Sequence, residues 1–227
     1  MTDNRFTSPD ALARQLADDL AGKMRESIAA RGRVCIAVSG GSTPVRFLEE
    51  LSKRKLDWSK VRVTLVDERW VPINSSRSNQ RLVTLELLQQ NAAKAHLLGL
   101  YREDIEAEEI NHIDDELKDL MPFDVVVLGM GTDGHTASLF PGGDKLLDAT
   151  RKDSKQNLTY MNAPDAGETR VTLTLPAIAS AKNLLLHIEG QTKRDVLEEA
   201  IESGEPAQLP IRYVLDACPD LRVVWAP

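Results

Sequence analysis

Few residues of this sequence can form covalent or metal cross-links. Its 227 residues include only two cysteines and four histidines, and they show no C-x-x-C or Cys/His spacing typical of a zinc site. Cys35 and Cys218 stand in apolar surroundings, which favours buried, reduced thiols. We therefore expect no metal site and a fold that depends on its hydrophobic core, which a chain of this length can bury.

The sequence also lacks long apolar runs and an excess of positive charge. No segment approaches the ~18 apolar residues of a membrane-spanning helix, and the first residues lack the apolar centre of a signal peptide. The formal net charge of −7 argues against a general nucleic-acid or membrane-surface binder. We expect a cytoplasmic protein with neither partner. A small anionic ligand stays open, because a few cations can dominate one pocket.

The residues that are present have the composition of an ordinary globular protein, with 42% hydrophobic and 28% charged residues. Apolar residues at four-residue steps, from Leu12 to Ile28, predict an amphipathic helix over 9–31, with Ser8 as its N-cap and Gly32 as its stop. Further helices are expected over 79–90 and 193–203. Strands are expected over 33–39, 61–66, 124–129, 158–162, 170–175, 183–190 and 221–225.

This alternation of apolar strands and amphipathic helices indicates an α/β fold. We expect a three-layer αβα, Rossmann-like architecture with a mostly parallel central sheet and helices on both faces. No low-complexity linker or internal repeat divides the chain, so residues 1–227 should form one domain, with 141–157 as a candidate mobile excursion. Ligands bind at the carboxyl ends of the strands in such sheets, so the loops after strands should carry the chemistry.

The first such loop, SGGSTP over 39–44, has the features of an anion site. Gly40 and Gly41 allow a close backbone approach, and the N–H groups and hydroxyls of Ser42 and Thr43 can point at a ligand beside the helix that Pro44 opens. The lysine of a P-loop is absent. A plain strand-to-helix turn stays open as the alternative, because glycine–serine turns are common.

The second loop, VDERWVP over 66–72, places three charged residues at the end of a strand. Alternation puts Asp67 and Arg69 on one side and Glu68 on the other. A carboxylate and a guanidinium on one side can orient a polyhydroxylated substrate or a charged intermediate. A surface ion pair followed by a packed Trp70 is favoured instead unless another loop converges here.

The third loop, GMGTDGHTASLFP over 129–141, begins with the G-x-G-x-x-G spacing of a dinucleotide site. Residues 141–143 interrupt the helix that should follow Gly134, and LLDATRKDSKQ further on is no strand carrying the required acidic residue. The spacing is therefore a weak signal, and a nicotinamide-dependent dehydrogenase is not predicted.

The same glycines can shape a loop that projects Asp133 and His135. An imidazole is the commonest general base, and a neighbouring carboxylate can hold its tautomer. A structural, hydrogen-bonded histidine is the alternative, but a glycine-flanked position at a strand end favours function. Because no G-x-S-x-G motif is present, attack by an activated water suits these residues better than an acyl-enzyme.

These loops resemble the 6-phosphogluconolactonase family, in the superfamily shared with glucosamine-6-phosphate deaminase and ribose-5-phosphate isomerase. The resemblance runs through SGGSTP (39–44), VDERWVP (66–72), SNQRLV (78–83), GMGTDGHTASLFP (129–141) and TRVTLTLPAI (169–178). It implies hydrolysis of 6-phospho-D-glucono-1,5-lactone to 6-phospho-D-gluconate in the oxidative pentose phosphate pathway, without a nucleotide cofactor. The expected partner is this small sugar-phosphate lactone, bound by a monomer or weak homo-oligomer.

Carried over by position, the resemblance implies a role for each site residue. His135 is the general base, while Asp67 and Arg69 orient the sugar and steady the oxyanion. The phosphate site comprises Gly40, Gly41, Ser42, Thr43, Arg170 and Lys193. Some relatives carry a lysine shortly before the arginine position, where this sequence offers only Asp165 and Glu168.

Two alternatives keep the same fold. A glucosamine-6-phosphate deaminase or isomerase resembles DGH but carries a glutamate in the segment that follows, which here is TASLFP. A non-catalytic sugar-phosphate-sensing domain normally carries a helix-turn-helix, for which a first helix at about residue 9 leaves no room. The lactonase is the favoured hypothesis.

Overall fold

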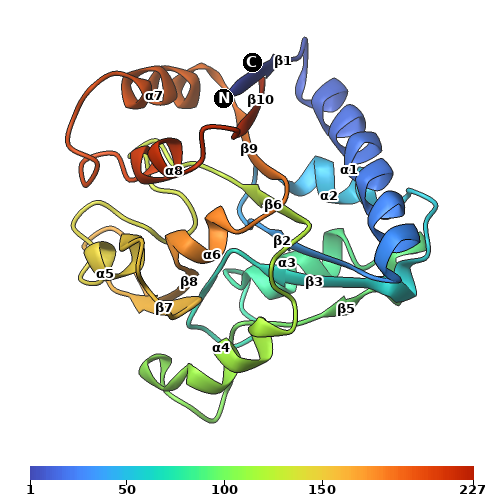
Figure 1. Ribbon diagram of the computed structural model, residues 1–227, viewed down its shortest axis with the longest axis horizontal. Coiled ribbons are helices and arrows are strands. Elements are labelled where there is room, and N and C mark those ends of the chain that lie inside the picture. Colours follow the sequence, from blue (N-terminus) through green and yellow to red (C-terminus); the bar gives the residue numbers. More distant parts are fainter.

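A seven-stranded sheet runs through the centre of the computed structural model, which describes residues 1–227 (Figure 1). Its strands are β1 (Thr2–Arg5), β2 (Val34–Val38), β3 (Val61–Leu65), β5 (His96–Leu97), β6 (Val125–Leu128), β9 (Leu184–Glu189) and β10 (Arg222–Ala226). The order is β1-β10-β9-β6-β2-β3-β5, and every neighbouring pair is parallel. β2 and β6 are buried throughout, as expected of near-continuous apolar strands covered on both faces.

Helices cover both faces of this sheet, so the predicted three-layer α/β fold is confirmed (Figure 1). On one side lie α1 (Pro9–Arg31) and α2 (Val45–Ser52), and on the other lie α6 (Leu175–Ala179), α7 (Gln191–Ile201) and α8 (Ile211–Ala217). The other helices are α3 (Asn79–Glu86), α4 (Asn111–Lys118), α5 (Leu146–Thr150) and the 3-10 turns η1 (Trp58–Lys60), η2 (Gln90–Lys94) and η3 (Ala107–Glu109). None of the helices combines the length and the apolar character needed to cross a bilayer.

The boundaries predicted for α1 are confirmed, because local chemistry sets both of its ends. Ser8 Oγ accepts a hydrogen bond from the Ala11 N–H at 3.2 Å, as an N-cap does. Gly32 adopts the left-handed conformation, with φ +75°, and its N–H bonds to the Ile28 carbonyl.

The predicted end of the helix over 79–90 is wrong. α3 ends at Glu86, and the chain continues into η2, where Gln90 has a positive φ. Leu85 is 48% exposed, whereas Val83 and Leu87 are fully buried at helical spacing. Within the segment 141–157, the predicted excursion, α5 buries Leu146.

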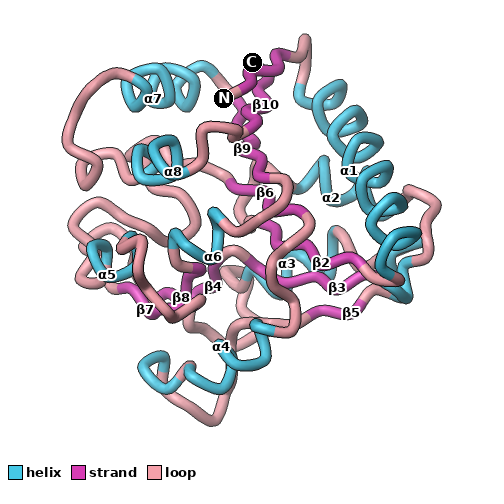
Figure 2. Tube along the Cα trace, viewed as in Figure 1, coloured by secondary structure: helices cyan, strands magenta, loops and turns pink.

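A second, antiparallel sheet was not predicted. It contains β4 (Asp67–Arg69), β8 (Arg170–Leu173) and β7 (Leu158–Met161), in that order (Figure 2). Two of the expected strands therefore lie outside the parallel sheet, and DER forms a strand of its own after β3. The register places Arg69 opposite Arg170. Pairing between such distant segments leaves no local signal in the sequence.

The order of the central strands creates a crevice between β2 and β6. From β2 the chain continues to β3 on one side, and it later returns to β6 on the other side. The connections at the carboxyl ends of these neighbours thus diverge, which is the usual ligand position in an open α/β sheet.

Candidate active site

A cavity of about 210 Å³ opens at the carboxyl ends of β2 and β6. It is lined by the loops that follow these strands and by side chains from β4, β8, β9 and the first turn of α7. The predicted site residues on its wall are Gly40, Gly41, Ser42, Thr43, Asp67, Arg69, His135, Arg170 and Lys193. Asp133, the remaining predicted residue, contacts the His135 side chain.

The glycines of 129–134 make room for His135. The Gly131 N–H bonds to the His135 carbonyl at 2.9 Å, and Gly134 has φ +74°. A Cβ on Gly131 would lie 2.3 Å from the His135 ring, closer than any real contact. The tight loop therefore requires glycine beside the imidazole.

Asp133 orients His135 as the triad interpretation expected. Its Oδ1 lies 2.6 Å from His135 Nδ1 and also accepts the His135 backbone N–H at 3.1 Å. Burial raises the pKa of the Asp133 carboxyl, but the hydrogen bond and charge of His135 outweigh it, so the net pKa is below the ordinary value. With Nδ1 engaged, Nε2 is the nitrogen that can exchange a proton with a ligand.

The 39–44 loop is tied to both the sheet and α7. Ser39 donates from its N–H and its hydroxyl to the Val127 carbonyl of β6. Lys193 Nζ donates to Thr43 Oγ1 at 3.0 Å. Burial lowers the pKa of Lys193, while the charge of Glu189 opposes that shift. The loop and the lysine thus lie together on the cavity wall.

Two arginines lie side by side on another part of the cavity wall. Arg69 and Arg170 are directly paired across β4 and β8, so their side chains share one face. Each has a buried Nε without a hydrogen-bond partner. Burial lowers the pKa of Arg170; the charge of Asp67 opposes this, and that of Arg69 adds to it. Facing like charges are costly alone, which makes this pair suited to an anion.

Asp67 is held by two residues that the sequence analysis missed as functional. Ser138 Oγ donates to Asp67 Oδ2 at 2.6 Å, and Asn79 Nδ2 donates to the Asp67 carbonyl at 2.9 Å. A Cβ on Gly40 would lie 2.0 Å from Asn79 Oδ1, so this glycine admits the asparagine. The signal available was position alone, since both residues stand inside the quoted motifs.

Glu68 fastens this strand to α3. Its carboxylate faces away from Asp67, as predicted, and accepts the backbone N–H groups of Arg69, Asn79 and Gln80. Burial raises the pKa of Glu68, and those three hydrogen bonds oppose the shift. Because Asp67 is 7% and Glu68 0% exposed, the alternative of a solvated surface ion pair is wrong.

His187 is a further residue that the sequence analysis missed. It lines the cavity from β9 while being only 1% exposed. The signal was a single histidine within the apolar run LLLHI. The predicted gap in cations before Arg170 contains Glu168, which pairs with Arg77 at 2.8 Å.

The cavity wall holds an excess of unsatisfied polar atoms. Five buried side-chain atoms of the protein have no hydrogen-bond partner, and those of Arg69, Asn79, Arg170 and His187 belong to this wall. Buried polar groups are usually satisfied, so this concentration indicates a site that a polar ligand completes. No group of three or more His, Cys, Asp or Glu side chains is arranged to hold a metal ion.

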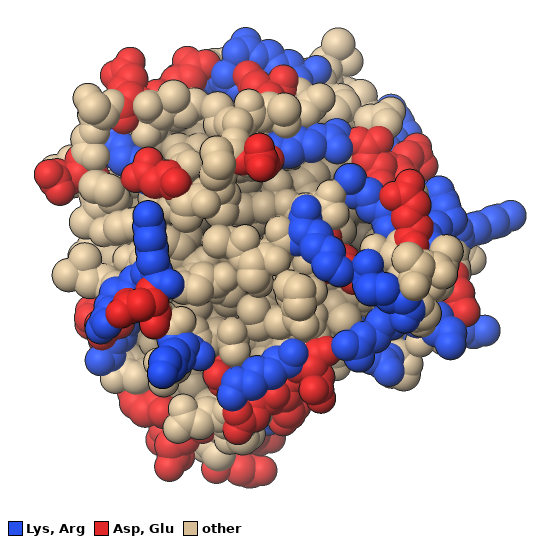
Figure 3. All heavy atoms as spheres, in the orientation of Figure 1, with Lys and Arg blue, Asp and Glu red and all other residues tan.

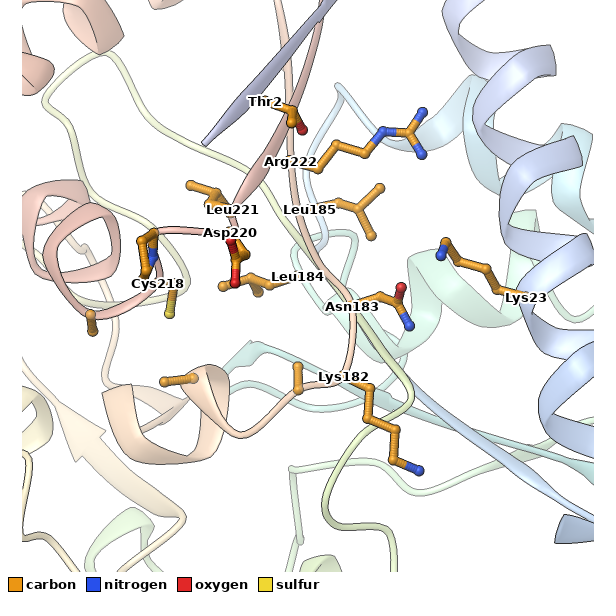
Figure 4. Close-up of a pocket in the computed structure, with 14 residues that line it drawn as sticks. Thr2, Lys23, Lys182, Asn183, Leu184, Leu185, Cys218, Asp220, Leu221 and Arg222 are labelled. Atoms are coloured by element: carbon orange, nitrogen blue, oxygen red, sulfur yellow. The ribbon is translucent and has the colours of Figure 1, made fainter. Parts of the chain in front are cut away.

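A second cavity, of about 430 Å³, lies at the amino ends of β9 and β10 (Figure 4). Lys182 on its wall pairs with Asp124 at 2.9 Å, and Arg222 pairs with Asp19 at 2.6 Å. Figure 3 shows the molecular surface in the same orientation as Figure 1, with acidic and basic side chains mostly around its rim. We assign no ligand to this second cavity.

Comparison with known proteins gives concordant matches. The family model for glucosamine-6-phosphate isomerases/6-phosphogluconolactonase matches residues 7–225. A 6-phosphogluconolactonase of Rhizobium meliloti (strain 1021) is 49% identical over 225 residues, covering 98% of this chain and 97% of the relative. One from Pseudomonas aeruginosa is 43% identical, covering 95% and 90%.

Solved structures match the fold of this chain over its whole length. A 6-phosphogluconolactonase from Shewanella baltica OS155 matches with a TM-score of 0.96 at 38% identity, covering 100% of this chain and 98% of that one. A monomeric glucosamine-6-phosphate deaminase matches with a TM-score of 0.79 at 18% identity, covering 100% and 97%, which shows a shared fold alone. The chain therefore belongs to the glucosamine-6-phosphate isomerase/6-phosphogluconolactonase family.

Proposed function

We propose that this protein is a 6-phosphogluconolactonase, which hydrolyses 6-phospho-D-glucono-1,5-lactone to 6-phospho-D-gluconate in the oxidative pentose phosphate pathway. The observation that carries the proposal is the convergence of an oriented imidazole, His135, with the 39–44 loop and three cations in one cavity. The high identity to named lactonases along the full length supports the same activity.

In the proposed mechanism His135 acts as the general base. Nε2 takes a proton from water as the water oxygen bonds to C1 of the lactone. Asp133, which holds Nδ1, stabilises the imidazolium that forms. When the C1–O5 bond breaks, the imidazolium returns the proton to O5, and the new carboxylic acid ionises to a carboxylate.

The remaining wall residues bind and orient the substrate. The Gly40–Thr43 loop and Lys193 bind the 6-phosphate, and Arg170 adds a planar, bidentate donor. Asp67 orients the sugar hydroxyls, and Arg69 steadies the oxyanion that develops at C1. Ser138 and Asn79 act through Asp67 as positioning residues.

Three further expectations, on domain organisation, cellular location and oligomeric state, accompany this proposal. Residues 1–227 act as one domain, supported by a single cluster of 60 buried hydrophobic residues that extends from Leu12 to Ala226. The protein works in the cytoplasm as a monomer or weak homo-oligomer. Sedimentation velocity across a range of concentrations tests the last statement, and a stable higher oligomer would contradict it.

A lactonase assay with freshly generated substrate tests the function. The release of 6-phosphogluconate is followed by a coupled reaction, and the spontaneous hydrolysis measured without enzyme is subtracted. We expect fast hydrolysis of the lactone and no release of ammonia from glucosamine 6-phosphate. Ammonia release with no lactone hydrolysis would instead favour the deaminase.

A further inference from the structure

One imidazole on the cavity wall has no part in the mechanism above. His187 is 1% exposed, and its Nε2 lies 3.2 Å from Glu189 Oε1. Its Nδ1 has no partner. A buried nitrogen left unsatisfied is costly, and its position on a cavity wall points to a bond that a ligand completes.

The immediate packing around this ring is apolar. Phe47 of α2 contacts it edge-on, with ring centroids 6.1 Å apart. On the neighbouring strand β10, the directly paired Val224 lies on the same face of the sheet as His187. None of these groups supplies a donor or acceptor to Nδ1.

Charged groups near His187 converge on Glu189. Glu189 pairs with Arg46 of α2 at 3.6 Å, and Arg46 also contacts the exposed Asp10 of α1. The charge of Glu189 also acts on Lys193 of α7, which donates to Thr43 in the 39–44 loop. Glu189 therefore links the imidazole with Lys193, the cation beside the 39–44 loop.

We propose that His187 is a phosphate-binding residue that takes up a proton from solvent when the 6-phosphate dianion binds. Nε2–H then donates to Glu189, and Nδ1–H donates to a phosphate oxygen. Carboxylate and phosphate on either side both stabilise an imidazolium, whereas a neutral ring would offer the dianion only a lone pair. The inference rests on the proposed function, which places the 6-phosphate of the substrate at residues 40–43.

Nitrogen-15 NMR of the four histidines tests the protonation directly in the unaltered protein. 6-Phosphogluconate and, separately, inorganic phosphate are titrated at pH 8, where free phosphate groups are dianions because their second pKa is about 6. We expect both His187 nitrogens to move to imidazolium positions with either probe. A neutral His187 at saturation overturns the proposal, and a response to 6-phosphogluconate but not to saturating phosphate moves the contact to the sugar and overturns it too.

Kinetics provide the second test. His187→Gln should raise KM for the lactone by about 10- to 100-fold, as expected for a lost charge-assisted hydrogen bond, and should change kcat less. Glu189→Gln leaves the ring in place but removes the carboxylate that stabilises the imidazolium, so it should also raise KM. The matched control is His112→Gln, at an exposed position of α4, with unchanged KM.

The outcomes separate this inference from the proposed function. A folded His187→Gln variant with normal KM overturns the phosphate role of His187 while lactone hydrolysis stands. Absence of lactone hydrolysis by the unaltered protein overturns the proposed function itself. If His187→Gln does not fold, the NMR titration of the unaltered protein decides.

Discussion

The cavities at the two ends of the central sheet differ in whether their polar groups already have partners. At the amino ends of β9 and β10, the larger cavity has a lysine and an arginine engaged in ion pairs with neighbouring carboxylates. At the carboxyl ends of β2 and β6, the smaller cavity has four side chains with a buried, unpartnered atom.

This difference shows that polar satisfaction identifies the site better than volume does, since the volumes are about 430 and 210 Å³ in the opposite order. An unsatisfied buried group is stable only if a ligand or water completes it at some stage of the working cycle. A paired group carries no such requirement. Variants at the two cavities should therefore have unlike effects, the largest at His135 and the smallest at Lys182.

His135→Ala should have the largest effect. Loss of a positioned base should lower kcat by about 10²- to 10⁴-fold, while 6-phosphogluconate still binds because the phosphate contacts remain. Steady-state kinetics measure kcat, and calorimetry measures the binding of 6-phosphogluconate. Turnover near that of the unaltered enzyme, with the fold intact, would remove His135 from the mechanism.

Gly131→Ala tests whether the glycine loop serves the imidazole. The added Cβ would lie 2.3 Å from the ring and must displace it, so we expect kcat to fall by up to about 10²-fold. Gly22→Ala in α1 is the control, because a Cβ there meets nothing within 4 Å. Equal kinetics for the two variants would contradict the proposed role of Gly131.

Arg170→Ala should act on binding. We expect KM for the phosphorylated lactone to rise by about 10-fold or more, since a charged hydrogen bond is lost, and inhibition by 6-phosphogluconate to weaken. Hydrolysis of unphosphorylated gluconolactone should be affected far less. If both substrates suffer alike, Arg170 does not clamp the phosphate.

The binding of 6-phosphogluconate should weaken at high pH. Burial lowers the pKa of Lys193, so its ammonium group loses the proton at a lower pH than an ordinary lysine does. The positive charge is present below this pKa and lost above it, and Kd measured by calorimetry should rise as the pH passes through it. Lys193→Met should bind more weakly and show a smaller rise, which retains only the proton uptake proposed for His187; a rise of the same size in the variant would exclude Lys193 as a titrating group.

Lys182→Met, in the amino-end cavity, should have the smallest effect. Lys182 is 42% exposed, and its partner Asp124 keeps Arg31 and the Cys35 N–H. We expect kcat and KM to stay unchanged and the free energy of unfolding to fall by at most about 1 kcal/mol. A marked loss of activity would erase the distinction between the cavities.

Local features of this protein could be predicted from the sequence. The ends of α1 follow from Ser8 and Gly32, whose hydrogen bonds and backbone conformation depend on residues a few positions away. The motif histidine and its aspartate are two residues apart, so their contact at 2.6 Å is also local. The ends of α1 and the His135–Asp133 contact were predicted because each depends on residues close together in the sequence.

Non-local features could not be predicted in the same way. The sheet β4-β8-β7 depends on pairing between distant segments, and the facing of Arg69 and Arg170 exists only through that register. Ser138 lies far along the chain from the Asp67 that it supports. His187 has no spacing or motif that distinguishes a ligand contact from a core histidine.

The sequence by itself determined the helix caps, the apolar strands and the polar loops that follow them, because periodicity and capping act over a few residues. Only the tertiary structure decided that these loops meet. The strand order places β2 beside β6, and the chain then brings Lys193 to Thr43 across 150 positions. Such contacts depend on burying a common core, which sets the distances between residues that no local pattern relates.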